Sequence, residues 1–251
     1  MEVIILGSGT CIPTLKRISP GMAIKIGPDN ILLDGGTGTI YQLLKAGIDY
    51  MGLDYILYTH LHCDHTAELI PLLFAIKYSL DRLRRKDLRI FGPPGFKDFY
   101  QALMSIYSKW TVSDFYRIIT QEVSCEPIEA EGWRCLAKPM THSTPTVGYR
   151  FEDRAGKTVV YSGDTDYCPG IVELAQGANL LILECSFPDE KRVVSHLTPG
   201  LAGKIAQEAQ CKRLVLTHLY PLCDQYDILG QCRKAFSGDI LLAHDLMRLA
   251  V

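Results

Sequence analysis

The sequence predicts a mixed α/β (α+β) fold in which sheets are covered by helices on their outer faces. Short apolar runs punctuated by Gly, Pro, Asn and Asp indicate strands, and longer runs with helical periodicity lie between them. The first half of the chain is rich in strands, whereas the second half alternates strand with helix. This order favours sheets whose apolar faces are buried by helices packed against them.

The predicted elements follow one another along the whole chain. Strands are expected at residues 2–6, 22–26, 30–34, 55–60, 88–92, 115–119, 146–151, 158–164, 180–184, 213–218 and 239–244. Helices are expected at residues 39–48, 67–83, 95–107, 170–178, 198–210 and 226–236. Because no linker, low-complexity tract or repeat interrupts them, we expect residues 1–251 to form one domain.

Composition indicates the cellular compartment of the protein but not its function. A formal net charge of −2 gives no global basic field, so a nucleic acid would have to be engaged by a local patch. No run approaches the roughly 18 apolar residues of a membrane span, and the N-terminus lacks signal-peptide features. The nine cysteines never form a CxxC motif, which is typical of reduced thiols. We therefore expect a cytoplasmic protein that does not enter a membrane.

Polar residues stand where four apolar strands are expected to end. His60 follows "YILYT", Asp164 follows "VVYSG", Glu184 follows "LLIL" and His218 follows "LVLT". The ends of core strands in α/β sheets converge on one edge, where such folds place ligands. We therefore expect these side chains to lie close together.

The segment "HLHCDH" at residues 60–65 carries three histidines and an aspartate. His60 and His62 are two positions apart, so in an extended chain they point the same way and can share one metal ion. Asp64 and His65 lie where the chain turns into the next helix and would face a neighbouring position. Imidazole nitrogen and carboxylate oxygen suit zinc, with iron or manganese as alternatives.

One loop cannot complete two metal sites, so distant residues must contribute. His142 would complete the first site, His218 the second, and Asp164 would bridge the two. Two divalent ions about 3.5 to 4 Å apart can hold a hydroxide between them and clamp both oxygens of an in-line displacement. A lone histidine near a strand end is usually a packing or surface residue, and only the compact cluster makes the distant residues credible ligands.

Taken together, these motifs resemble the metallo-β-lactamase superfamily, and their pattern is most similar to its ribonuclease Z branch of tRNA 3′-processing endonucleases. The shared stretches are "LGSGTCIPT", "PTLKR", "LLDGG", "HLHCDH", "GPPG", "HSTPTVGYRF", "YSGDT", "LILECSF", "SHLT", "LTH" and the terminal "DLM". The resemblance implies a four-layer αββα sandwich with a di-metal site at one edge. It also implies metal roles for His60, His62, Asp64, His65, His142, Asp164 and His218.

The resemblance further implies residues that act beside the metals. Asp64, Glu184 and His196 would be catalytic, with Glu184 and His196 forming a pair that protonates the leaving group. The plainer alternatives are a strand-end salt bridge for Glu184 and a polar helix-entry residue for His196. Asp34 resembles a residue that supports the metal ligands, although a turn aspartate would look the same. Cys63, between the ligands, is expected to be a small buried residue.

Several stretches depart from the ribonuclease Z pattern. The interval between "GPPG" and the strand at 115–119 holds one helix and has no room for the flexible arm that grips tRNA. The family's "GEGTQ" is "GTGTI", "HST" has become "HLT", and the lysine of "PTLKR" stands one place late. The basic run "DRLRRKDLR" could contact phosphates through Arg82, Arg84, Arg85, Lys86 and Arg89, or complement the dipole at a helix C-terminus.

The sequence thus predicts a metal-dependent hydrolase with two divalent ions, most consistent with a phosphodiesterase or a ribonuclease Z-like endonuclease. The expected partner is a phosphodiester substrate, which could be RNA, and a homodimer is a possible assembly. The first alternative is hydrolysis of another ester, such as a cyclic phosphodiester, lactone or thioester, by the same metal centre. An alternative from another class is a non-catalytic binding module that keeps the metals for stability.

Overall fold

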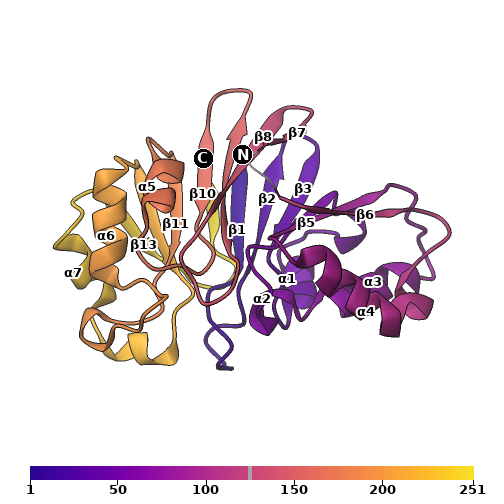
Figure 1. Ribbon diagram of the computed structural model, residues 1–251, viewed down its shortest axis with the longest axis horizontal. Helices are drawn as coiled ribbons and strands as arrows, with labels where there is room; N and C mark the ends of the chain where they lie inside the picture. The colour runs from indigo at the N-terminus through magenta and orange to yellow at the C-terminus, as the bar shows by residue number, and fades with distance from the viewer. Residues whose placement is uncertain (124–125) are drawn as a thin grey trace.

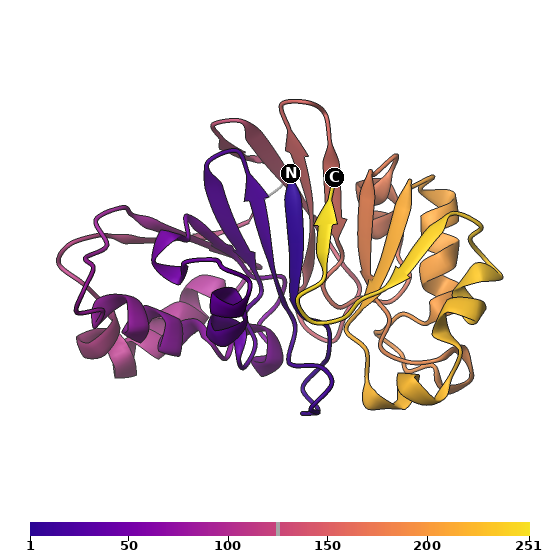
Figure 2. The same ribbon diagram turned by 180° about the vertical axis from the view of Figure 1, so that it is seen from behind.

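The computed structural model describes residues 1–123 and 126–251, and within this part of the chain the strands form two sheets of seven. The first sheet has the order β14, β1, β2, β3, β4, β5, β6, and the second has the order β13, β12, β11, β10, β9, β8, β7. The sheets lie face to face, with helices α1 to α4 outside the first and α5 to α7 outside the second (Figure 1, Figure 2). The predicted αββα arrangement is confirmed.

The bounds of the elements follow the chain from one end to the other. The strands are β1 Glu2–Gly7, β2 Gly21–Ile26, β3 Asp29–Leu33, β4 Tyr55–Leu57, β5 Leu88–Gly92, β6 Ile118–Glu122, β7 Ile128–Ala130, β8 Trp133–Pro139, β9 Val147–Asp153, β10 Thr158–Tyr161, β11 Leu180–Glu184, β12 Arg213–Thr217, β13 Asp239–Leu242 and β14 Arg248–Ala250. The helices are α1 Thr39–Lys45, α2 Cys63–Thr66, α3 Leu69–Lys77, α4 Phe96–Thr111, α5 Pro169–Ala175, α6 Pro199–Glu208 and α7 Ile228–Arg233. Short 3₁₀ turns occupy Tyr50–Gly52, Asp189–Lys191 and Pro221–Gln225.

Alternation along the strands produces three apolar cores. In β1, Val3 and Ile5 belong to the core between the two sheets, while Ile4 and Leu6 face the helices. This is the period-two pattern of a strand that is buried on both faces. The outer core of the second sheet joins Leu181 and Leu183 of β11 to the apolar sides of α5, α6 and α7. Each sheet is therefore fixed on both faces, which makes its strand ends rigid supports for side chains.

Parallel strands in each sheet bring the predicted site residues to one edge. The pairs β3–β4, β4–β5 and β5–β6 are parallel in the first sheet, as are β10–β11, β11–β12 and β12–β13 in the second. The carboxyl ends of β4, β10, β11 and β12 meet at the lower edge in Figure 1, where the loop after β1 also projects. This edge is where polar residues following the strands are expected to gather.

The structure contains strands that the sequence patterns did not predict. β7 and β8 form a hairpin at the end of the second sheet, and β14 pairs with β1. In β8 a charged residue separates Trp133 from Cys135, and both of these residues are buried while Arg134 is exposed. Because charged residues interrupt its apolar pattern, the sequence did not indicate that this segment is a strand with alternating burial. The strand expected at residues 115–119 is real but lies further on, as β6.

Helix ends also differ from the expected ranges. The run expected to be helical over residues 67–83 is a helix only to Lys77, where α3 ends, and the basic segment 81–89 lies beyond it in a loop and the start of β5. In contrast, α4 extends to Thr111, past the expected end at residue 107. None of the helices in the described residues is long and apolar enough to cross a membrane. The eight cysteines that the structure describes are free thiols, and Cys125 lies outside the described residues.

Candidate metal centre

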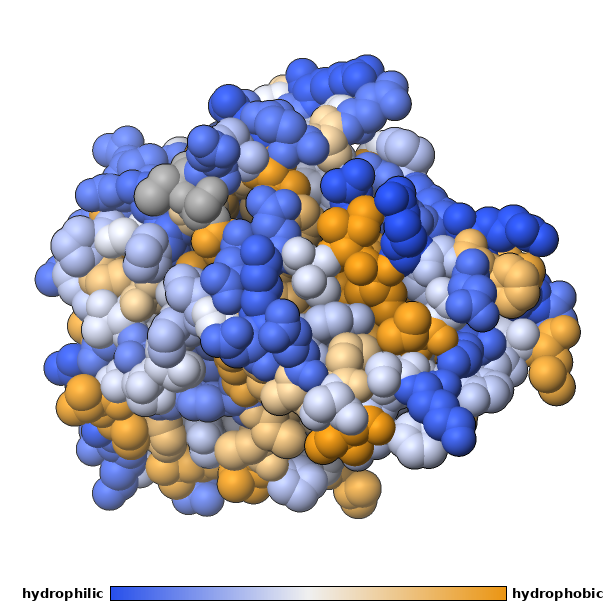
Figure 3. Space-filling model, turned by 45° about the vertical axis from the view of Figure 1, so that its right-hand side comes forward, coloured by the Kyte–Doolittle hydropathy of each residue, from blue (hydrophilic) through white to orange (hydrophobic). Residues whose placement is uncertain are grey.

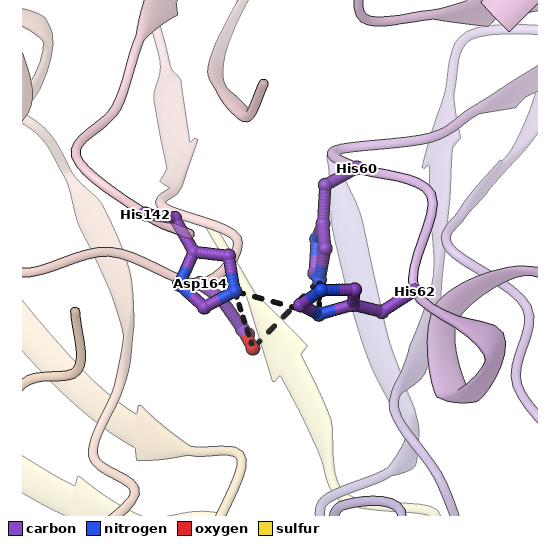
Figure 4. A group of neighbouring side chains, drawn as sticks. All are labelled: His60, His62, His142 and Asp164. Carbon is purple, nitrogen blue, oxygen red and sulfur yellow. Dashed lines mark hydrogen bonds and ion pairs between the residues drawn. The ribbon is translucent and has the colours of Figure 1, made fainter. Parts of the chain in front are cut away.

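The seven predicted ligands come from both sheets and meet at the edge described above. His60 follows β4, while His62, Asp64 and His65 lie at and within the short helix α2. The second sheet contributes His142 from the β8–β9 loop, Asp164 from the end of β10 and His218 directly after β12. Figure 4 shows His60 and His62 reaching the site from one side, and His142 and Asp164 from the other.

Four of these residues form a first group of converging atoms. His60 Nε2 lies 3.1 Å from His62 Nδ1 and 3.8 Å from Asp164 Oδ2. His142 Nε2 lies 3.4 Å from His62 Nδ1 and 3.9 Å from the same carboxylate oxygen. Figure 4 shows these atoms facing a common centre. The donor set is three imidazole nitrogens and one carboxylate oxygen.

A second group shares Asp164 with the first. His65 Nε2 and His218 Nε2 are 3.4 Å apart, and each lies 3.5 Å from Asp164 Oδ1. Asp64 Oδ2 lies 3.6 Å from His218 Nε2 and 4.0 Å from His65 Nε2. The second donor set is therefore two imidazole nitrogens and two carboxylate oxygens, one of them from Asp164.

These spacings fit tetrahedral coordination. Ligand atoms placed 2.0 to 2.1 Å from a zinc ion at tetrahedral angles stand about 3.3 to 3.4 Å from one another. The separations given above run from 3.1 to 4.0 Å, so most of the ligand atoms stand at this spacing or somewhat further apart. In addition, Asp164 Oδ1 is buried without a hydrogen-bond partner among the described residues. An unpartnered buried carboxylate oxygen is costly, and a cation between it and the two histidines would satisfy it.

Hydrogen bonds to the far sides of the rings orient the histidines. His65 Nδ1 lies 2.8 Å from Asp34 Oδ2, and His142 Nδ1 lies 2.9 Å from the carbonyl oxygen of Ser195. His218 Nδ1 lies 2.9 Å from Ser186 Oγ. Donation to these oxygens places the proton on Nδ1, so the lone pair of Nε2 points into the site, as a metal ligand requires.

Asp34 lies at the centre of this supporting network. It is fully buried and adopts a left-handed backbone conformation with φ of 54°, which aspartate tolerates better than most residues. Its carboxylate accepts hydrogen bonds from Thr59 N and Thr59 Oγ1 as well as from Tyr161 Oη. Asp34 therefore fixes both the His65 ring and the chain just before His60, which is more than a turn aspartate does.

Glu184 and His196 form the predicted pair beside the second group. His196 Nδ1 lies 2.9 Å from Glu184 Oε1, and this oxygen also accepts from Thr165 N. Ser186 Oγ donates to Glu184 Oε2 at 2.6 Å. Glu184 is almost fully buried, whereas His196 is half-buried and its ring centroid lies 5.0 Å from that of His142. The pair is thus held at the margin of the site, with a proton on the side of His196 that faces Glu184.

Burial and the neighbouring charged groups determine whether His60 and His196 are protonated. Burial, followed by the neighbouring histidines, holds the pKa of His60 far below its usual range, so this ring is neutral and able to bind a metal. Burial also opposes the charged form of His196, but the hydrogen bond and charge of Glu184 outweigh it and raise the pKa of His196. His196 is therefore the group in the pair that retains a proton near neutral pH.

Comparison with known proteins places this geometry in a family. A family profile described as a Beta-lactamase superfamily domain matches residues 29–219, which include all seven residues of the two groups and Asp34. The chain belongs to the beta-lactamase superfamily. The superfamily resemblance expected from the "HLHCDH" segment is confirmed.

Relatives of this beta-lactamase superfamily chain carry one recurring name. The protein named Ribonuclease Z from Methanothermobacter thermautotrophicus is 27% identical over 100% of this chain and 97% of its own length. A second Ribonuclease Z, from Methanosarcina mazei, is 29% identical over 100% of this chain and 98% of its own length. Both alignments extend beyond 300 positions, whereas this superfamily member has 251 residues, so the relatives contain segments without a counterpart here.

Solved structures agree with the sequence relatives. Human tRNase Z, short form, superposes with a TM-score of 0.81 at 25% identity, over 100% of this chain and 99% of that chain. The metallo-β-lactamase fold protein YhfI from Bacillus subtilis has a TM-score of 0.87 at 24% identity, over 99% of this chain and 98% of that chain, which bears on the fold. In this superfamily member, residues 93–117 form α4 and its connections, which confirms the single helix expected in this interval.

Two expectations from the sequence, about Cys63 and about the basic run at residues 81–89, are wrong for this beta-lactamase superfamily chain. Cys63, the first residue of α2, is exposed rather than buried. The basic run does not complement the dipole of a helix C-terminus, because α3 ends at Lys77. Arg84 is buried and donates to the carbonyl oxygens of Met51 and Asp87, while Arg82 and Lys86 pair with Asp49 and Asp54. The cations of this run mostly hold the loop together.

The supporting residues include several that sequence reasoning missed. Ser186 joins His218 to Glu184, and Ser195 accepts from His142 although its own backbone has a φ of 76°. Thr59 and Tyr161 complete the contacts of Asp34. Their only signal in the sequence was adjacency to a predicted ligand or acid, since small hydroxyl residues carry no pattern of their own.

Proposed function

We propose that this beta-lactamase superfamily chain is a metal-dependent phosphodiesterase of the ribonuclease Z kind. The observation that carries the proposal is the buried carboxylate of Asp164, which faces two groups of ring nitrogens with its two oxygens. The names of the relatives and the presence of the Glu184–His196 pair support hydrolysis of a phosphodiester in particular.

In this proposal two divalent ions are bound by the chain, and zinc is the best match to the donor atoms. His60, His62, His142 and Asp164 would hold one ion, and Asp64, His65, His218 and Asp164 the other. Bound ions of this kind supply a nucleophilic water at neutral pH and neutralise charge on the phosphate. Manganese or iron would suit the same donors, so metal analysis of the purified protein is needed to assign both identity and number.

The residues of the chain itself orient the ligands and move a proton. Asp34, Ser186 and Ser195 hold the Nδ1 protons of three ligand rings, which keeps each Nε2 free. His196 donates its Nδ1–H to Glu184, leaving Nε2 as the atom that gives a proton to the departing alkoxide oxygen. Glu184 keeps that ring protonated and correctly turned, because its carboxylate is itself fixed by Ser186 and Thr165.

Hydrolysis by matched variants tests the proposal. Purified protein should hydrolyse bis(p-nitrophenyl) phosphate and lose this activity with a chelator or with His62→Ala. His244→Ala is the matched control, because His244 is an exposed histidine outside both groups. A pre-tRNA, a short single-stranded RNA and a cyclic nucleotide in the same assay would identify the natural class of diester.

Other outcomes would favour the alternatives. Hydrolysis of a lactone or thioester in the absence of phosphodiester hydrolysis would assign the centre to another ester class. Metal-loaded protein that hydrolyses none of these substrates would point to a binding module instead. The phosphodiester assignment is contradicted by either result.

Two further proposals concern the setting of the protein. We propose that it acts in the cytoplasm, in keeping with the free thiols of its described cysteines.

We also propose that it forms a homodimer. Figure 3, with the α3 and α4 side turned forward, shows hydrophobic side chains in several groups separated by hydrophilic ones. The exposed apolar residues of these helices include Phe74, Ile106 and Trp110. Light scattering would give the mass in solution, and a monomer at micromolar concentration would contradict the dimer.

A further inference from the structure

A stacked pair of aromatic rings stands beside the proton donor. The centroids of Phe187 and Tyr220 are 4.6 Å apart with an interplanar angle of 23°. The His196 ring lies edge-on to Phe187 at 5.7 Å and is 6.4 Å from Tyr220. Both aromatic residues are half-buried, and neither belongs to any of the three apolar cores. Their stacking is therefore not explained by core packing.

The position of His196 tells which part of a substrate would meet this pair. The centroid of the His196 ring lies 5.0 and 6.1 Å from those of His142 and His218 and 5.7 Å from that of Phe187, and Tyr220 lies 6.2 Å from His218. In the proposed reaction His196 protonates the leaving oxygen. The group attached to that oxygen would therefore lie within reach of the aromatic pair, which neighbours both His196 and His218.

The loop after β1 borders the aromatic pair. Tyr220 Oη lies 3.6 Å from Cys11 Sγ, which brings the loop after β1 against this side of the site. Arg17 of the same loop pairs with Asp224, in the 3₁₀ turn just after Tyr220. Leu15 in this loop and Val194 in the loop that carries His196 are both exposed. The loop after β1 therefore borders Tyr220, and both rings of the pair are only half-buried.

From this arrangement we infer that Phe187 and Tyr220 bind the base of the nucleoside that leaves when a nucleotide diester is hydrolysed. The inference rests on the proposed phosphodiesterase function and adds the class of leaving group. Water adds to phosphorus as the bond from phosphorus to the sugar oxygen breaks, and that oxygen takes a proton from His196, giving a phosphate monoester and a nucleoside hydroxyl. The attacking water releases one proton to solvent, and His196 regains a proton from solvent. Stacking on an aromatic ring tolerates any base, because every base has a flat π face.

A pair of matched dinucleotides tests the inference. One is adenylyl adenosine, and the other lacks the base on the nucleoside that product analysis identifies as the leaving one. The native protein should show a kcat/KM about 10-fold or more higher on the first substrate, mainly through a lower KM. In Phe187→Leu and Tyr220→Leu the ratio of kcat/KM between the two dinucleotides should fall toward one. Phe187→Trp, which keeps an aromatic ring, should keep the native ratio. Phe115→Leu, which changes an exposed aromatic residue outside the site, should keep the native ratio.

The possible results separate the two proposals. Hydrolysis of bis(p-nitrophenyl) phosphate with equal kcat/KM on both dinucleotides, or with no cleavage of either, overturns base binding while leaving the phosphodiesterase in place. A loss of rate in Phe187→Leu that is the same on both dinucleotides also overturns it, because it would reflect displacement of His196 alone. Failure on every diester, including the nitrophenyl one, overturns the proposed function and this inference with it.

Discussion

The Glu184–His196 pair is where the chemistry depends on single atoms. Glu184 raises the pKa of His196 against the opposing effect of burial, so the ring remains protonated to a higher pH than it otherwise would. In Glu184→Gln the charge is lost and burial prevails, so the alkaline fall in kcat/KM on a dinucleotide should move to lower pH. The pH profile with a nitrophenyl ester should not move, because that leaving group needs no proton. Identical shifts on both substrates would contradict the assignment of His196 as the acid.

Asp34 leads to a prediction about the stability of the fold rather than about the reaction. Asp34→Asn keeps the shape but turns one acceptor oxygen into a donor facing the Thr59 or His65 hydrogens. We expect the free energy of unfolding to fall by roughly 2 kcal/mol, the cost of a buried polar group left without a partner. Urea denaturation measures this, and the exposed Asp114→Asn is the control. Equal stability of the two variants would show that Asp34 is dispensable.

Individual ligands could be predicted from sequence because histidine and aspartate are distinctive residues in a distinctive spacing. His60, His62 and His65 formed a cluster with no packing purpose, and Asp164 and His218 followed apolar strands. Ser186 and Ser195 could not be predicted, because their roles arise from where two loops meet in space. Whether the seven residues bind metal remains a prediction, although the structure brings their donor atoms together.

At the scale of elements, the loop that carries His196 is fixed by a buried carboxylate. Asp166 accepts from Ser195 N at 3.2 Å and from Arg192 at 3.1 Å, and Ser195 in turn holds His142. In Asp166→Ala we expect kcat on a dinucleotide to fall about 10- to 100-fold, because His196 loses its fixed position. Asp166→Asn, which keeps one acceptor, should retain more activity. Steady-state kinetics decide this, and a full rate in Asp166→Ala would refute the role.

The segment at residues 81–89 gives a second prediction at this scale. Arg84 is buried over the Tyr116 ring and donates to two carbonyl oxygens, whereas Arg85 is exposed. Arg84→Ala should lower the free energy of unfolding by roughly 2 kcal/mol, because it leaves these acceptors unsatisfied. Arg85→Ala should change it by less than about 0.5 kcal/mol. If urea denaturation gave equal effects, the run would have no structural role.

The elements themselves were predictable to different degrees. Strands buried on both faces, such as β1 and β11, are continuous apolar runs and were found at nearly their true bounds. β8 was missed because Arg134 and Lys138 break its apolar pattern, and β14 because three residues are too few for a pattern. The run 67–83 seemed to be one helix because the periodicity continues after Lys77, where the loop packs Arg84 inward and the helix has already ended.

At the scale of the whole molecule, the candidate centre joins the two sheets. His60, His62, Asp64 and His65 come from the first sheet, and His142, Asp164 and His218 come from the second. Asp164 Oδ2 faces His60 and His142, and Asp164 Oδ1 lies 3.5 Å from both His65 and His218, so either ion would be held by residues of both halves. Without an ion, Asp164 Oδ1 is buried with no hydrogen-bond partner among the described residues. Metal binding should therefore be linked to the stability of the whole fold.

Removal of the metal tests this linkage directly. An ion that binds only the folded state at a free concentration 1,000 times its dissociation constant adds about 4 kcal/mol to the free energy of unfolding. For a chain of this size, that corresponds to a rise in melting temperature of about 10 °C. Dialysis against a chelator should lower the melting temperature by this order, and added Zn²⁺ should restore it. Asp164→Ala should melt at one temperature with or without Zn²⁺, whereas His244→Ala should respond as the native protein does. If neither the chelator nor Zn²⁺ changed the melting temperature of the native protein, the two sheets would be held together without any ion. The interpretation of these seven residues as a metal centre would then be wrong.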